Sequence, residues 1–296
     1  MDCQRGRWGF SMRGYYIQLA DQGRNAAWRY LVGILITIFV WMAGSVLFAL
    51  PIFIGLIQPE SPFGLTLMLL PFGLLLAGSL MAVRLLHQRP IATLIGPLGR
   101  ISWPQVWRGF ILFFLLAAIA TIVEALLHPG RYSLNPSFVV TLPSLLVGLV
   151  LIPIQTSAEE VFFRGYLLQG LGRLTQNWLL LSVANGILFT LPHLSNPEAE
   201  GQPWLAALNW FAAGAFLTLV TLRSGSLNLA LGIHAAFNLF AFGVAGYPNA
   251  ALPLFSLFKA STLDARFALG SFLICCVVAH WLLFRWRGIM AEPSYR

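Results

Sequence analysis

Long apolar runs follow one another along almost the whole chain, and they constrain its fold more than any other feature. A helix needs about 20 apolar residues to cross the hydrocarbon core of a bilayer. By that measure the sequence predicts eight membrane-spanning helices. They cover residues 30–57, 63–86, 109–127, 138–158, 177–194, 204–222, 226–246 and 266–286, and the fourth continues as a helix to residue 171. The predicted fold class is all-α, a polytopic membrane helical bundle.

The composition supports a multi-pass protein. Of the 296 residues, 58% are hydrophobic and only 9% are charged, which is too few charges to cover the surface of a soluble domain. The three cysteines, Cys3, Cys275 and Cys276, form neither a disulfide framework nor a CxxC metal site. We therefore expect an integral membrane protein that is surrounded by the lipid bilayer.

The basic residues set the expected orientation. The formal net charge is +8, but the arginines fall between apolar runs, which is the pattern of membrane topology and not of a nucleic-acid-binding face. With the N-terminus in the cytoplasm, only Arg131, Lys259 and Arg266 lie outside, which leaves 15 of the 18 basic residues on the inner side. Both termini are therefore predicted to be cytoplasmic, and no nucleic-acid partner is expected.

The chain is expected to be organised in four parts. Residues 1–29 form a basic cytoplasmic N-terminal tail with a short interfacial helix, and residues 30–137 hold the N-terminal transmembrane helices. Residues 138–246 form a transmembrane core that carries the polar motifs described next. Residues 247–296 hold a loop, the last transmembrane helix and a basic C-terminal tail. The connector 87–108, which contains arginines and prolines, is expected to lie along the interface.

Two adjacent glutamates stand near the end of the fourth predicted span and are followed by Arg164. A carboxylate at the centre of a membrane helix costs about 2.5–3.5 kcal/mol, and Glu159 and Glu160 are two of only ten acidic residues. Residues four apart share a helix face, so Glu160 is expected to pair with Arg164. Glu159 lies about 100° around the helix and stays free to act as a general base. The competing interpretation is that all three residues end a span in water.

Two later segments carry further polar groups. His193 closes the fifth predicted span, with Phe189 one turn before it, and a histidine at the end of a span is commonly an interfacial residue. His234 and Asn238 lie four apart in the seventh span, so both project from one helix face. Each of these polar groups needs a partner in lipid, either in a helix–helix hydrogen bond or in a functional site.

Together these motifs follow the order Glu-Glu-x-x-x-Arg, Phe-x-x-x-His and His-x-x-x-Asn on three hydrophobic segments. The chain resembles the CPBP family of intramembrane proteases over residues 138–246. That family takes in the type II CAAX prenyl endopeptidases and bacterial proteins linked to bacteriocin processing and immunity, which include the Abi proteins and those similar to lysostaphin-resistance protein A. All three motifs are complete in this chain.

The resemblance implies roles for seven residues. Glu159, assisted by His193, would activate a water, and His234 with Asn238 would stabilise the oxyanion. Glu160, Arg164 and Phe189 would give structural support. The cofactor stays unknown: Glu159, His193 and His234 are an acceptable ligand set for a divalent metal such as zinc, and a metal-free, glutamate-driven mechanism is the alternative. Nothing in the spacing of these residues demands a metal.

The expected activity is endopeptidase cleavage of a membrane-associated protein or peptide. The substrate is either a prenylated CAAX protein or a leader peptide, and the short loops favour a prokaryotic cytoplasmic membrane. Two other functions are open: a non-catalytic immunity or scaffold protein, and a proton-coupled transporter that uses the carboxylates as a relay. The transporter lacks support because no inverted repeat is visible.

A geometric question accompanies these roles. Span counting places His193 near the outer end of its helix, whereas Glu159 and His234 lie nearer the inner end. A common site needs all three close to one water. It therefore requires a tilted or late-starting fifth span, or a helix that is broken near Pro192; otherwise His193 is not catalytic.

Overall fold

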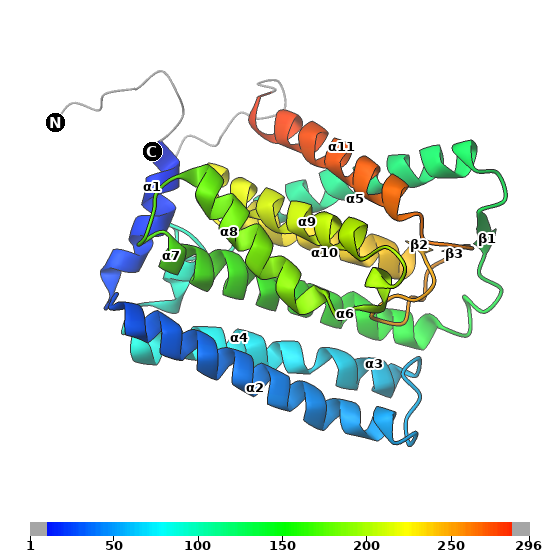
Figure 1. Cartoon of the computed structure of the whole chain (residues 1–296), viewed down its shortest axis with the longest axis horizontal. Helices are drawn as coiled ribbons and strands as arrows, with labels where there is room; N and C mark the ends of the chain where they lie inside the picture. Colours follow the sequence, from blue (N-terminus) through cyan, green and yellow to red (C-terminus); the bar gives the residue numbers. More distant parts are fainter. Residues whose placement is uncertain (1–10, 286–296) are drawn as a thin grey trace.

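The computed structural model describes residues 11–285 and consists almost entirely of helices packed side by side (Figure 1). Within residues 11–285, six helical segments are long and apolar enough to cross a membrane. Four of them are single helices: α2 (Ala27–Phe53), α5 (Trp103–Leu127), α9 (Pro203–Ser224) and α11 (Ala265–Phe284). One further segment consists of α3 (Pro62–Leu69), α4 (Pro71–Met81) and η2 (Ala82–Leu86). The last consists of α6 (Leu142–Glu159), η4 (Glu160–Leu167) and α7 (Leu168–Leu171). The all-α polytopic bundle predicted from the apolar runs is confirmed.

Two of the eight predicted spans are shorter than a typical membrane crossing. The segment of α8 (Trp178–Thr190) and η5 (Leu191–His193), and α10 (Asn228–Gly243), are apolar helices of 10–17 residues. For α10 the reason is its position, because most of its residues are buried and it packs on α5, α6 and α9. A helix enclosed by other helices does not have to match the thickness of the hydrocarbon core by itself.

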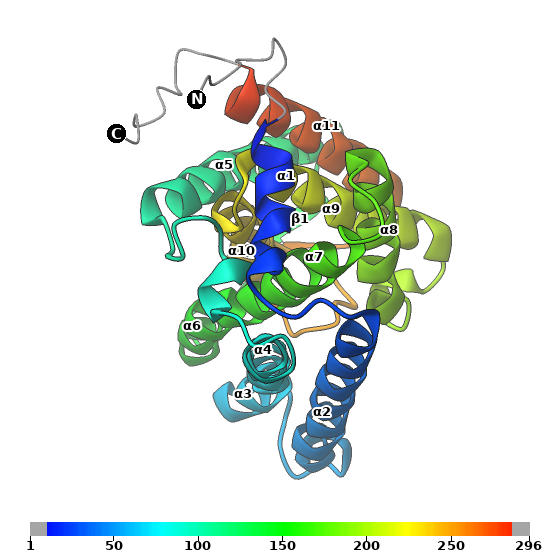
Figure 2. The ribbon, with the colours of Figure 1, turned by 90° about the vertical axis from the view of Figure 1, so that its left-hand side faces the viewer.

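The helix that runs from α6 to α7 lies at the centre of the bundle. On one side it packs on α3 and α4, which pair with α2, and on the other it packs on α10. Figure 2 shows α2 and α4 below α6, with α1 (Ser11–Gln18) across the near end of the bundle. Buried apolar side chains of this helix, which carries the two adjacent glutamates, therefore belong to several of the hydrophobic clusters of the bundle.

Part of the predicted N-terminal tail is built into the bundle. Residues 1–10 lie outside the described residues, but α1 and η1 (Leu19–Gln22) are helical, as the predicted short helix requires. Tyr16 is fully buried, and its hydroxyl lies 2.7 Å from the Leu94 carbonyl oxygen and 3.1 Å from that of Arg164. The buried face of this helix thus supports the core of the bundle.

The connector after η2 also enters the core. His87 and Arg89 are both fully buried. The His87 ring lies 2.7 Å from the Arg24 carbonyl oxygen and 3.0 Å from the Tyr166 hydroxyl, and burial lowers the pKa of His87. The polar atoms of His87 therefore join the N-terminal helices to the helix that carries the site, a contact that the sequence pattern did not indicate.

A three-stranded sheet closes the end of the bundle opposite α1 (Figure 1). β3 (Phe258–Ala260) pairs antiparallel with β1 (Tyr132–Leu134) and parallel with β2 (Ala245–Gly246). Beside it, Arg131 forms ion pairs with Glu124 at 2.6 Å and with Asp264 at 3.2 Å. Arg131, Lys259 and Arg266 all belong to this end, so the three basic residues predicted to lie outside are together. The predicted C-terminal tail beyond residue 285 lies outside the described residues.

The contact of α10 with α5 depends on glycine. A Cβ at Gly232 would stand 1.9 Å from the Val106 carbonyl oxygen, whereas a Cβ at Gly270 in α11 would meet nothing within 4 Å. We expect Gly232→Ala to lower the free energy of unfolding by about 1–3 kcal/mol through overpacking. Gly270→Ala should leave it unchanged or higher, because alanine favours helix. Thermal unfolding in detergent, followed by tryptophan fluorescence, measures both; equal melting temperatures would contradict the close contact.

Candidate active site

The two adjacent glutamates stand where α6 changes into the π-helical segment η4. A π-helical turn inside an α-helix is a frequent feature of functional sites. Glu159 is 6% exposed, and Glu160 and Arg164 are fully buried. The alternative that these three residues end a span in water is therefore wrong.

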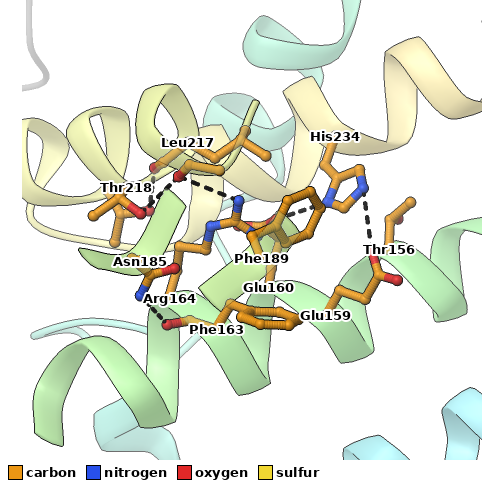
Figure 3. A network of polar contacts seen from close by, with 12 residues as sticks. Thr156, Glu159, Glu160, Phe163, Arg164, Asn185, Phe189, Leu217, Thr218 and His234 are labelled. Atoms are coloured by element: carbon orange, nitrogen blue, oxygen red, sulfur yellow. Dashed lines mark hydrogen bonds and ion pairs between the residues drawn. The ribbon is translucent and has the colours of Figure 1, made fainter. Parts of the chain in front are cut away.

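Glu160 binds two partners inside the bundle (Figure 3). Its Oε1 lies 2.8 Å from an Arg164 guanidinium nitrogen, as the four-residue spacing predicts, and 2.7 Å from Nδ1 of His234. The Arg164 guanidinium also lies 4.4 Å from the centre of the Phe189 ring and 3.4 Å from the Gly214 carbonyl oxygen. Arginine is suited to such a site, because it keeps its charge and stacks on an aromatic face.

His234 lies between the two glutamates. Nδ1 donates to Glu160, and Nε2 lies 3.4 Å from Oε2 of Glu159 (Figure 3). Because Arg164 pairs with Glu160, His234 is the basic side chain that lies beside Glu159. Either His234 is an imidazolium beside an ionised Glu159, or Glu159 holds the proton beside a neutral ring.

Asn238 has a partner that sequence reasoning missed. Its amide nitrogen lies 3.1 Å from Oε1 of Gln155, and Gln155 is 6% exposed. Gln155 stands four residues before Glu159 and so belongs to the same helix face. That spacing, together with a polar amide in an apolar run, was the signal that could have identified it.

His193 lies at the end of the fifth predicted span, where α8 tightens into the 3₁₀ turn η5. Its Nδ1 lies 2.7 Å from the Phe189 carbonyl oxygen. A carbonyl only accepts, so Nδ1 carries the hydrogen and Nε2 of the neutral ring has a free lone pair. The Phe189 ring lies 4.6 Å from the His193 ring and 5.9 Å from the His234 ring, centre to centre. The helix thus changes type next to Pro192, which is where the span counting places a break that would let His193 share a site with Glu159 and His234.

A cavity of about 1470 Å³ joins these groups. Its polar wall contains most of the predicted site residues together with Gln155: Gln155, Glu159, His193, His234 and Asn238. The wall that α2 and α4 form is apolar, and its residues include Ile34, Ile38, Trp41, Phe72 and Leu75. Such a cavity can admit water to Glu159 while one side accommodates an apolar group.

The donors of a metal site are not assembled in this arrangement. Within residues 11–285 no group of three or more histidine, cysteine, aspartate or glutamate side chains is placed to hold a metal ion. Glu160 is occupied by Arg164 and His234. Glu159, His193 and His234 all line the cavity, but they are not such a group as these side chains stand.

Comparison with known proteins agrees with the motifs. The sequence profile of the family described as type II CAAX prenyl endopeptidase Rce1-like matches residues 135–240. The chain is 36% identical over 236 residues to the uncharacterized protein YyaK of Bacillus subtilis (strain 168), and the match covers 74% of this chain and 78% of that protein. No solved structure matches the chain. The matched profile contains every motif residue from Glu159 to Asn238, and the relative extends the similarity over most of the membrane bundle, so the chain belongs to the Rce1-like type II CAAX prenyl endopeptidase family of membrane proteases.

Proposed function

We propose that this protein is an intramembrane endopeptidase that hydrolyses a peptide bond of a membrane-associated protein or peptide. One observation carries the proposal: a carboxylate, Glu159, lines a large cavity inside a membrane bundle beside His234, while Arg164 balances the charge of the neighbouring Glu160. A structural ion pair would not need that cavity. The family to which the chain belongs is a protease family.

The proposed base is Glu159. Its carboxylate takes a proton from a water in the cavity, the water oxygen attacks the scissile carbonyl carbon, and a tetrahedral oxyanion forms. The C–N bond then breaks, and the proton passes from Glu159 to the leaving amine. His193 assists by accepting a hydrogen bond from the water at its free Nε2, a role that its hydrogen bond to the Phe189 carbonyl oxygen favours.

The proposed oxyanion site consists of His234 and Asn238. With Glu159 ionised, His234 is the imidazolium, so its Nε2–H is a charged donor beside the carboxylate. Asn238 gives one amide hydrogen to Gln155 and keeps the second for the substrate. Donors that are fixed in advance in a buried site stabilise a developing oxyanion strongly.

The proposed substrate lies at the membrane. The apolar cavity wall on α2 and α4 suits a lipid chain or apolar side chains. A prenylated CAAX protein is the substrate that the family name implies, and a leader peptide is the alternative. The relative in Bacillus subtilis favours a prokaryotic cytoplasmic membrane as the location. The mechanism we propose uses the glutamate and no metal step.

The first prediction concerns Glu159. Glu159→Gln removes the base without changing the shape of the side chain, and we expect it to lower cleavage by about 10²–10⁴-fold. The measurement compares peptide termini in membranes of a strain that lacks the protein, complemented with wild type, Glu159→Gln or Glu60→Gln at matched levels. Glu60 is exposed and lies outside the site, so its variant should act as wild type.

If wild type and Glu159→Gln give the same peptide termini, and both retain an immunity phenotype, the scaffold function is favoured. If an activity of this protein depends on the proton gradient across the membrane, the transporter function is favoured.

The second prediction concerns the ion pair. Arg164→Met leaves Glu160 buried without its cation, which costs about 3–5 kcal/mol, and Glu160→Gln/Arg164→Met should recover part of that loss. The control is Arg173→Met, because Arg173 and Asp21 pair at the surface with side chains 43% and 50% exposed, and exposed pairs contribute about 0–1 kcal/mol. Melting temperatures in detergent measure all three. A double variant no more stable than Arg164→Met would count against the pairing.

The third prediction concerns Gln155 as a positioning residue. Gln155→Leu frees the Asn238 amide to turn, so we expect kcat to fall about 10- to 100-fold while KM changes little. Gln155→Glu keeps an acceptor for Asn238 and should retain more of the rate. In a double-mutant cycle, adding Gln155→Leu to Asn238→Ala should cause little further loss. Independent, additive losses would contradict the coupling.

A further inference from the structure

The cavity extends from the proposed catalytic groups to the end of the bundle that carries the sheet. At that end it is lined by Glu198, which belongs to the short turn η6 (Pro197–Ala199), and by Asn209 of α9. η6 packs on α9, and the next residue of α9, Trp210, lies 5.5 Å from the His193 ring, centre to centre. Glu198 and Asn209 therefore line the same cavity as the proposed active site, on two elements that pack on each other.

Glu198 is held firmly by one of its oxygens. Its Oε1 accepts a hydrogen bond from the backbone nitrogen of Ala251 at 2.9 Å and from the Tyr247 hydroxyl at 3.5 Å. These contacts join η6 to the loop that follows α10. The carboxylate thus has a fixed position on the cavity wall before any ligand arrives.

The charge of Glu198 is not balanced by any ion pair in the part of the chain that the structure describes. The other carboxylates that line the cavity do have basic partners: Glu124 and Asp264 pair with Arg131, and Glu159 lies beside His234. Glu198 takes part in none of the ion pairs between residues 11 and 285. A half-buried carboxylate that has no counter-ion on a cavity wall is a favourable partner for a cationic ligand.

Two buried oxygens here also lack hydrogen-bond partners. They are Oε2 of Glu198 and Oδ1 of Asn209. Both are acceptors, so a ligand that satisfies them has to bring donors. Lysine and arginine side chains carry several donors and no acceptor, and their positive charge compensates a carboxylate.

We propose that Glu198 and Asn209 form a specificity site for a cationic nitrogen of the substrate peptide, the side chain of a lysine or arginine a few residues from the scissile bond. The inference rests on the proposed endopeptidase function and adds a sequence preference to it. A free α-amino group has the same chemistry, and the test separates the two sources.

The test measures binding to the Glu159→Gln protein, which retains peptides without cleaving them. The probes are nine-residue peptide libraries, N-acetylated or with free N-termini, that carry lysine, norleucine or glutamate at the central position and mixed residues elsewhere. Bound peptides are quantified by mass spectrometry. We expect central lysine to be enriched roughly 10- to 100-fold over norleucine, as a charge-assisted hydrogen bond predicts, and glutamate to be depleted.

Three further variants in the same background locate the effect. Glu198→Gln keeps the shape and the acceptor oxygen for Ala251 but removes the charge, so the preference for lysine should disappear. Glu200→Gln, two residues away and exposed, should keep it. Tyr247→Phe removes a hydrogen bond to the loop but leaves the carboxylate, and it should also keep most of the preference.

The outcomes separate this inference from the proposed function. Lysine enrichment that survives Glu198→Gln, or no enrichment in the starting protein, overturns the specificity site. Enrichment that appears only with free N-termini assigns the site to an α-amino group and overturns the side-chain assignment. Glu198-dependent binding by a protein whose wild-type form cleaves nothing supports the site and contradicts the protease.

Discussion

The buried guanidinium of Arg164 is the group on which the rest of the site depends. It lies at membrane depth with no exposure to solvent, where a charge persists only if its surroundings compensate it. Glu160 provides the opposite charge, and the Phe189 ring provides an aromatic face. Once Glu160 is fixed by this pair, its Oε1 can orient His234 through Nδ1. Three segments of the core, α6–η4, α8 and α10, are therefore held together by one cation.

This arrangement explains how two neighbouring carboxylates can differ. Glu160 is enclosed and binds Arg164 and His234 through Oε1, whereas Glu159 faces the cavity and makes, among the described residues, the longer 3.4 Å contact with Nε2 of His234. A charge-assisted hydrogen bond is normally near 2.7–2.9 Å. Glu159 therefore keeps capacity to bind a water in the cavity.

Much of this fold could be predicted from the sequence, because long apolar runs and four-residue spacings are local patterns. They identified the helices and the Glu160–Arg164 pair. The contacts of His234 with both glutamates, and of Asn238 with Gln155, join residues more than 70 positions apart, so no spacing rule reveals them. The burial of Tyr16 and Arg89 was missed for a related reason: a short polar segment looks interfacial until the bundle that encloses it is known.

The cavity walls also limit how a peptide can lie in the site. Apolar side chains of α2 and α4 form one wall, the proposed base lies on α6, and the uncompensated carboxylate of Glu198 lies toward the sheet. A substrate with an apolar segment beside a single basic residue satisfies all three surfaces at once. A uniformly apolar segment would leave Glu198 desolvated and unpaired, and a strongly polar one would lose the contact with α2 and α4. Selectivity then follows from the placement of one charge along the peptide, and the catalytic groups themselves need not distinguish one peptide bond from another.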